Sequence, residues 1–286
     1  MASHSELGVS DALDQLPVLR QRAGIPDPLL FRTLETFLFV SRGSGQLATG
    51  KWQRATQKKG LVLVVGGVGG LDLCGFCMRR AVKAAGLPYA VEVVVWGHGF
   101  GRWYSDLSDV AHLDRQAERV AGSIRGFRAE HPGQPVFVVG KSGGAGIAVK
   151  ALERLDLDSV ERAVLLAPAL SPRYDLTAAL RAVKRGVVVF WSPLDVMILG
   201  VGTRLFGTID GVRTRGAGLV SFAVPGPDEP DGPRRCQYAK LRQVCWRPRM
   251  AGLGHLGGHF GSEHPRFLRA CVVPLLRADP AAEAGL

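Results

Sequence analysis

The chain has 286 residues, of which 47% are hydrophobic and 21% are charged. This ordinary globular usage excludes a disordered, collagenous or low-complexity protein and supplies enough apolar material for a sizeable core. Lys and Arg number 36 against 25 Asp and Glu, so the net charge is +11, which raises the question of an anionic partner.

The basic excess has two interpretations. Most of the basic residues are arginine, a bias that a GC-rich coding sequence produces without selection for binding. The densest run of basic residues has two aromatic residues, Tyr238 and Trp246, between its members. The basic members are Arg234, Arg235, Lys240, Arg242, Arg247 and Arg249. Because this run matches no nucleic-acid-binding module, we expect no nucleic-acid partner. We interpret the charge as surface character, with peripheral membrane contact as the sharper alternative.

The N-terminal residues are polar, and no apolar run reaches the roughly 20 residues that a spanning helix needs. We therefore expect a cytoplasmic protein, peripheral to a membrane at most. Five cysteines that form no disulfide framework fit a reducing compartment. Residues 1–58 are interpreted as an appendage to one domain, residues 59–286. Within the appendage, Leu29–Val40 is expected either to dock on the core or to contact a membrane interface.

From about residue 60, strand-like and helix-like segments alternate, which is the pattern of a parallel sheet covered by helices. The predicted strands are Leu61–Val65, Val91–Trp96, Val136–Val139, Ala163–Leu166 and Val187–Phe190, with weaker candidates at Leu219–Val224 and Gln243–Trp246. The predicted helices are Met78–Ala85, Leu113–Glu130, Gly143–Leu155 and Pro265–Leu276. The main strands are apolar without alternation, as a sheet buried on both faces requires.

A predicted strand runs into Gly140-Lys141-Ser142-Gly143-Gly144, which has the G-x-S-x-G pattern of a nucleophile elbow. Such a turn holds its middle residue in a strained conformation, and the small flanking residues let the strand and the helix approach closely. Ser142 is therefore the candidate nucleophile. A phosphate-binding loop is excluded because its first glycine would fall at Pro135, where the strand itself replaces the loop.

The glycine cluster Gly66-Gly67-Val68-Gly69-Gly70 follows the first strand. It lacks the third glycine of a dinucleotide-binding fingerprint, since Asp72 stands there. In a hydrolase, a backbone N–H at this place faces the carbonyl under attack, and the residue after the nucleophile supplies another. We predict Val68, with Gly69 as second choice, and Gly143 as the oxyanion-hole donors. A tight turn without a ligand is the alternative.

A nucleophilic serine needs a base, and the base needs an orienting carboxylate. Asp195 comes just after a predicted strand, at the edge where such sheets carry their sites, and Asp210 is the reserve acid. For the base, His259 is preferred over His255 because Gly257-Gly258 lets the chain turn inward. The two histidines are spaced as metal ligands on a helix would be, but the glycines between them argue against a helix.

Three further features are weighed. The pair Cys74 and Cys77 forms a C-x-x-C at a helix start, a setting that lowers the pKa of a thiol. Because the motif lies inside the sheet's first strand-helix-strand unit, helix packing is favoured over redox or metal chemistry. His98 and Gly69 are candidates for lining the pocket. Lys141, beside Ser142, is a third candidate for the pocket. Its side chain either favours an anionic acyl group in the substrate or points away from the pocket.

Taken together, GGVGG, GKSGG, SPLD and GGHFG resemble the α/β-hydrolase family in its lipase/esterase-like branch, over residues 60 to 277. The resemblance implies a mostly parallel sheet with helices on both faces, with little or no lid domain. It implies that Ser142, Asp195 and His259 hydrolyse an ester or related acyl bond in a small molecule, without a metal or organic cofactor. The alternative is a non-catalytic protein of this fold that binds a lipid, a membrane surface or a protein partner.

Overall fold

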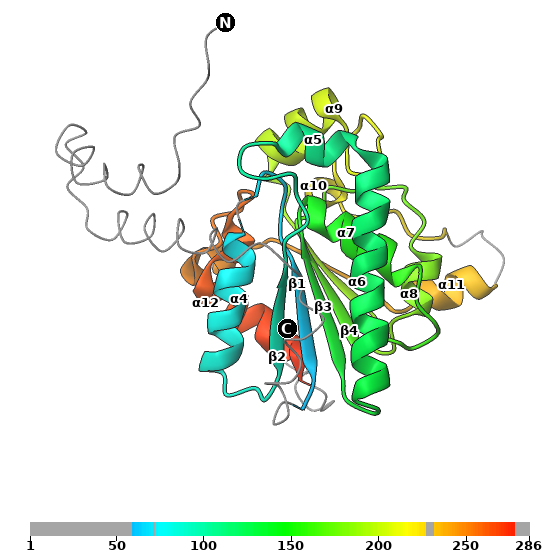
Figure 1. Ribbon diagram of the computed structural model, residues 1–286. Helices are drawn as coiled ribbons and strands as arrows, with labels where there is room; N and C mark the ends of the chain where they lie inside the picture. Colours follow the sequence, from blue (N-terminus) through cyan, green and yellow to red (C-terminus); the bar gives the residue numbers. More distant parts are fainter. Residues whose placement is uncertain (1–58, 71, 227–231, 278–286) are drawn as a thin grey trace, which may run out of the picture. The chain divides into compact units, whose positions relative to one another are not determined.

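The computed structural model describes residues 59–70, 72–226 and 232–277. The proposed N-terminal appendage, residues 1–58, lies outside the described residues, and so does the Leu29–Val40 stretch within it. In the described part, the strands form a six-stranded, wholly parallel sheet in the order β2-β1-β3-β4-β5-β6, with helices packed around it (Figure 1). The predicted fold class is confirmed.

The strands are short, and all except β6 are mostly apolar; they lie close to where the sequence predicts them. Their bounds are β1 (Leu61–Val65), β2 (Ala90–Val94), β3 (Val136–Lys141), β4 (Arg162–Leu166), β5 (Val187–Trp191) and β6 (Leu241–Cys245). The weaker candidate at Gln243–Trp246 is confirmed, since most of it belongs to β6.

The other weak candidate, Leu219–Val224, is wrong. Its first residues close the short helix α10 (Ala217–Val220), and Ser221 then takes a φ of 69°, which no strand accommodates. The segment is held in place by Gly218, whose carbonyl accepts a hydrogen bond from Ser192 N at 2.9 Å. These contacts seat α10 over the ends of β4 and β5, so tertiary packing overrides the local strand propensity.

The helices fill the connections between the strands. Their bounds are α4 (Leu73–Ala84), α5 (Trp103–Ser108), α6 (Val110–Glu130), α7 (Gly143–Leu152), α8 (Thr177–Arg181), α9 (Thr203–Phe206), α10, α11 (Pro233–Tyr238) and α12 (Pro265–Phe267). None of the helices in the described ranges is long and apolar enough to cross a bilayer. Between β4 and β5 the chain adds α8 alone as a helix, which fits the expected lack of a large lid.

Two helical segments differ from their predicted form. Helix α4 begins at Leu73, earlier than predicted, because the Asp72 carboxylate accepts a hydrogen bond from Gly75 N at 2.8 Å and caps the helix. The predicted terminal helix Pro265–Leu276 is helical throughout, but α12 passes into a π turn over Leu268–Val272 and a 3-10 turn over Val273–Leu276.

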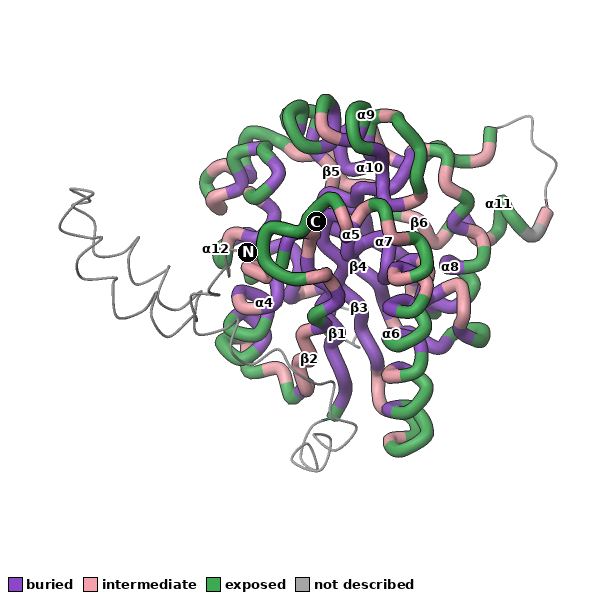
Figure 2. Tube along the Cα trace, turned by 45° about the horizontal axis from the view of Figure 1, so that its top comes forward, coloured by how far each residue is buried: buried purple, intermediate pink, exposed green. Residues whose placement is uncertain are grey.

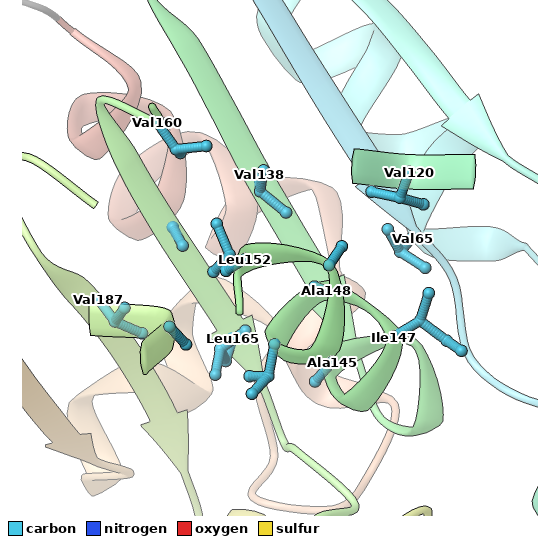
Figure 3. Packing of buried hydrophobic residues seen from close by; sticks show 14 of the residues in the cluster. Val65, Val120, Val138, Ala145, Ile147, Ala148, Leu152, Val160, Leu165 and Val187 are labelled. Carbon is cyan, nitrogen blue, oxygen red and sulfur yellow. The ribbon is translucent and has the colours of Figure 1, made fainter. Parts of the chain in front are cut away.

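The central strands β1, β3, β4 and β5 are buried on both faces, whereas the edge strands β2 and β6 are partly exposed (Figure 2). Alternate residues of a strand point to opposite faces. On one face, Val138 and Leu165 belong to the cluster with α6, α7 and α8 (Figure 3). On the other, Val139 and Leu166 belong to the cluster with α4 and the C-terminal helical segment. This arrangement explains why the strands read as continuous apolar runs.

The order of the strands sets the place of the site. Strand β1 pairs with β2 on one side and with β3 on the other, so the chain changes direction along the sheet after β2. The carboxyl ends of β1 and β3 are neighbours, with Val65 beside Gly140. Open α/β sheets hold their ligands at such a switch point. The glycine cluster after β1 and the turn after β3 therefore meet at one edge of the sheet.

The C-x-x-C at the start of α4 is packed into the core. All five cysteines are free thiols. Burial raises the pKa of Cys77 to about 11 and raises that of Cys74 well above its usual range. Because the thiolate is the reactive form, these shifts oppose redox or metal chemistry and agree with the predicted packing role.

Two glycines in helix interiors should respond in opposite ways to alanine. Gly126 is exposed in α6 and has open space where a Cβ would lie, so Gly126→Ala should raise the free energy of unfolding by about 0.5–1 kcal/mol. At Gly146 in α7, a Cβ would lie 2.1 Å from Ile209 Cγ2, so Gly146→Ala should lower it by about 1–3 kcal/mol. Urea unfolding measures both values, and equal effects would contradict the packing described.

Candidate active site

Ser142 occupies a sharp turn between β3 and α7. Its φ of 53° and ψ of −121° lie in a region that costs a residue with a side chain roughly 1–3 kcal/mol. The surrounding chain holds this conformation, because Ser142 N donates to Leu166 O at 3.0 Å, and Ser142 O accepts from Ala145 N and Ala169 N, each at 3.1 Å. The turn therefore rests on β4 and on the residues that follow it.

Two glycines make this turn possible because they lack side chains. A Cβ on Gly140 would lie 2.7 Å from Ala145 Cα, and one on Gly144 would lie 2.0 Å from Gly66 O. Real Cβ atoms do not approach backbone atoms this closely. The G-x-S-x-G pattern thus has a geometric reason, since both glycines let α7 start directly against the ends of β3 and β1.

Three predicted residues meet at this turn. His259 Nε2 lies 2.9 Å from Ser142 Oγ, and His259 Nδ1 lies 2.6 Å from Asp195 Oδ2. Asp195 comes just after β5, and none of the three residues is more than 9% exposed. A ring nitrogen that faces a carboxylate carries the proton, so Nδ1 is the donor and Nε2 presents its lone pair to the serine hydroxyl.

The two reserve residues have other partners. The ring of His255 packs edge-on against Phe267, with centroids 4.8 Å apart, and its Nδ1 accepts a hydrogen bond from Gly257 N at 3.2 Å. Asp210 accepts a hydrogen bond from Ser171 N at 2.9 Å. Both residues therefore support loops around the site.

The pKa of His259 suits proton acceptance. Burial, followed by the positive charge of Lys141, lowers this pKa to about 4, against the opposing effect of Asp195. At neutral pH the imidazole is therefore uncharged and can take a proton from a hydroxyl.

Lys141 is directed to the loop of the histidine and not to a substrate surface. Its side chain is 2% exposed, its Nζ donates to His259 O at 2.8 Å, and it lies 3.6 Å from Glu263 Oε1. Burial raises the pKa of Glu263, and the adjacent Lys141 opposes that rise. Of the two expectations for Lys141, the structure shows the side chain pointing away from the pocket, in a buried ion pair.

The two segments predicted to supply the oxyanion-hole amides are in contact. A Cβ on Gly143 would come within 2.6 Å of Val68 Cγ1, so the loop after β1 touches the start of α7. Among the described residues, the N–H groups of Val68 and Gly143 find no acceptor. The N–H of Gly69, the second choice, donates to Asp106 Oδ2 at 2.7 Å and is thus occupied.

Asp106 is a residue of the site that no sequence motif marks. Its buried carboxylate accepts hydrogen bonds from Gly69 N and His98 N, both at 2.7 Å, and lies 2.9 Å from His98 Nδ1. It thereby ties the loop after β1 to the loop after β2, and it turns His98 toward itself. Glu263 is another such residue. Asp106 lies in the short helix α5 and Glu263 lies in a 3-10 turn. Elements this short have no periodicity that would mark an acidic residue as buried, so a periodicity argument could not have found either.

The buried ion pair supports a stability prediction. Lys141→Met leaves the Glu263 carboxylate buried without its partner and should lower the free energy of unfolding by about 3–5 kcal/mol. Lys141→Met combined with Glu263→Gln should recover much of this loss, because no isolated charge remains. Lys184→Met is the matched control, since Lys184 is 62% exposed in its ion pair with Glu161 and should cost at most about 1 kcal/mol. Equal losses from the two single variants, measured in urea, would contradict the assignment.

Several solved structures of hydrolases resemble this chain at low sequence identity. A CIB-like hydrolase from Thermoplasma acidophilum is 13% identical, with 77% of this chain and 87% of that chain covered and a TM-score of 0.42. An α/β-superfamily hydrolase from Xanthomonas campestris is 16% identical, with 74% of this chain and 96% of that chain covered and a TM-score of 0.38. The Trichoderma reesei cutinase is 14% identical, with 81% of this chain and 82% of that chain covered and a TM-score of 0.29. Each likeness is distant, and none bears on the reaction of this chain.

Comparison with curated proteins gives no match. The family model described as "Serine aminopeptidase, S33" matches residues 59–205, a stretch that runs from the residues before β1 to α9 and covers more than half of the chain. The chain therefore belongs to the serine aminopeptidase S33 family of α/β hydrolases.

Proposed function

We propose that the protein is a serine hydrolase that cleaves an ester or related acyl bond with Ser142, His259 and Asp195. The supporting observation is the unbroken line of contacts from Ser142 Oγ through both ring nitrogens of His259 to Asp195, at 2.9 and 2.6 Å. A serine hydroxyl becomes a nucleophile when an adjacent base takes its proton, and that base works best when a third group orients it.

The reaction follows from this arrangement. Ser142 Oγ attacks the carbonyl carbon while its proton passes to His259 Nε2, and the resulting oxyanion accepts hydrogen bonds from the amides of Val68 and Gly143. The tetrahedral intermediate then expels the alcohol, which takes the proton from Nε2. Water repeats the steps on the acyl-enzyme and releases the acid. Asp195 holds the Nδ1 proton throughout and stabilises the transient imidazolium.

Exposed apolar side chains next to the three residues support a substrate with an apolar group. Phe260 is 65% exposed, and its ring centroid lies 5.5 Å from that of His259. Leu194, next to Asp195, is 52% exposed. Trp103 on α5 contacts Phe206 on α9 with ring centroids 4.9 Å apart, where Figure 1 shows the two helices side by side. Apolar surface gathered in this way is typical of a binding face.

The non-catalytic alternative has less support. A protein that only binds through this fold has no need for a histidine between a serine and a carboxylate, yet His259 lies within hydrogen-bond distance of both. The cytoplasmic location, a small-molecule substrate and contact with a membrane surface stay predictions.

Removal of the nucleophile gives the most direct test. Ser142→Ala should lower kcat for short p-nitrophenyl esters by roughly a millionfold, as loss of a triad serine does elsewhere, and should abolish labelling by a fluorophosphonate probe. His259→Ala should be similarly inactive. Ser171→Ala is the matched control, because Ser171 Oγ donates to Asp210 and is not hydrogen-bonded to any histidine of the described residues. Labelling or hydrolysis that persists in Ser142→Ala would sink the proposal.

The pH dependence should carry the mark of the buried histidine. Because His259 acts as a base only when neutral and its pKa is about 4, kcat/KM should stay constant through weakly acidic pH and fall as the pH drops through about 4. The measurement is the initial rate of ester hydrolysis between pH 3 and 9. An acid limb near the ordinary imidazole value of 6.5 would contradict the described burial.

Acid also affects folding, so a control is needed. His255 and His259 both have a pKa of about 4 in the folded chain, against 6.5 ordinarily. The unfolded chain therefore binds protons first, and their contribution to the free energy of unfolding is lost as the pH falls from 6.5 toward 4. Circular dichroism at each pH separates this loss from the kinetic one.

A further inference from the structure

A second cluster of polar side chains lies outside the proposed triad, in the loop after β2 and at the start of α6. One nitrogen of His98, one nitrogen of His112 and one carboxylate oxygen of Asp109 all lie within 4.8 Å of one another. The two imidazole rings face each other with centroids 4.1 Å apart. Two imidazoles and a carboxylate at this spacing form a ligand set that transition-metal ions prefer.

The outer hydrogen bonds of both histidines fix which nitrogens carry protons. His98 Nδ1 lies 2.9 Å from Asp106 Oδ1, and His112 Nε2 lies within hydrogen-bond distance of Trp96 O. Both partners are acceptors, so each of these ring nitrogens is the donor. In the neutral form of each ring, the opposite nitrogen then presents a lone pair. Histidine ligands of metals are oriented in this way, with the second N–H held by a carboxylate or a carbonyl.

A cation between the two atoms would satisfy the contact between His98 and Asp109. With the proton of His98 on Nδ1, its Nε2 lone pair faces Asp109 Oδ2 at 3.3 Å, so two acceptors oppose each other. Two ligand atoms held at tetrahedral angles by one zinc ion, each at about 2.0–2.1 Å, are about 3.3 Å apart. The observed separation matches that span and exceeds the about 2.7–2.9 Å of a charge-assisted hydrogen bond.

We propose that His98, Asp109 and His112 form a binding site for a divalent transition-metal ion, with Zn²⁺ as the ion of choice. Nitrogen ligands disfavour Mg²⁺ and Ca²⁺, which take oxygen ligands. Asp109 is 41% exposed, which gives an ion access from solvent and leaves a coordination position for water. The site is separate from the triad, and the hydrolysis proposed above does not require it.

The ion would stiffen the surroundings of the triad through Asp106. This carboxylate holds His98 on one side and accepts the N–H of Gly69 on the other, at 2.7 Å. Gly69 is adjacent to Val68 in the loop after β1. A metal bound to His98 would fix the position of the Asp106 carboxylate, whose other oxygen accepts the N–H of Gly69. It would thereby hold the loop that carries Val68, the proposed oxyanion donor. This consequence rests on the proposed function, whereas metal binding itself does not.

The test uses the full-length chain after treatment with a chelator. Isothermal titration with Zn²⁺ should give one site per chain, and Mg²⁺ at the same concentrations should give none. Asp109→Asn should weaken Zn²⁺ binding by at least about 100-fold, more than loss of an outer-sphere partner does. Asparagine still caps α6 in place of the Asp109 carboxylate, which accepts His112 N at 2.8 Å. His112→Gln should have a similar effect.

Two controls separate this site from others. His131→Ala, at the far end of α6, and His259→Ala, in the triad, should both bind Zn²⁺ as the parent chain does. Co²⁺ in the site should give visible ligand-field bands without a sulfur charge-transfer band, which excludes the cysteines. Zinc affinity that is absent in the parent chain, or unchanged in both Asp109→Asn and His112→Gln, would overturn the proposal. Either result leaves the Ser142 labelling experiment unaffected, so the two proposals fail separately.

Discussion

The structure of the site depends on one close approach of backbone to backbone. At Gly144 the first turn of α7 comes so near to Gly66 O that a Cβ would lie 2.0 Å from it. This contact is possible only where β1 and β3 are neighbours, which the order of the sheet ensures. It sets the turn of Ser142 against the loop that carries Val68. Any side chain at this position would push apart the turn of Ser142 and the loop that carries Val68.

The polar groups around the site are arranged in two layers with different physical roles. The inner layer, Ser142, His259 and Asp195, forms a line of short contacts. The outer layer consists of buried charges, Lys141 with Glu263 and Asp106, which hold backbone carbonyls and amides of the loops. A buried charge is costly without partners. Lys141 and Asp106 each hold a backbone group of a loop beside the inner layer, and Glu263 partners the charge of Lys141.

The sequence predicts the scaffold and the inner layer far better than the outer one. Apolar runs and glycine motifs locate the strands and the turn of Ser142, because burial on both faces and close backbone contact leave clear residue patterns. Asp195 and His259 follow from chain order. Asp106 and Glu263 could not be found, since their burial arises from tertiary contacts. Leu219–Val224 failed for a related reason, because contacts with distant strand ends impose a helix on residues of strand propensity.

The position of Lys141 couples two residues that are distant in sequence. Lys141 precedes the serine in the chain, and its Nζ holds the carbonyl oxygen of the histidine. The ammonium thus links the turn of Ser142 to the loop of His259. A displacement of that loop would pull on the residue next to the serine, so the two groups are constrained to shift together. The contact between His259 Nε2 and Ser142 Oγ is thereby backed by a second link between the two segments that carry these residues.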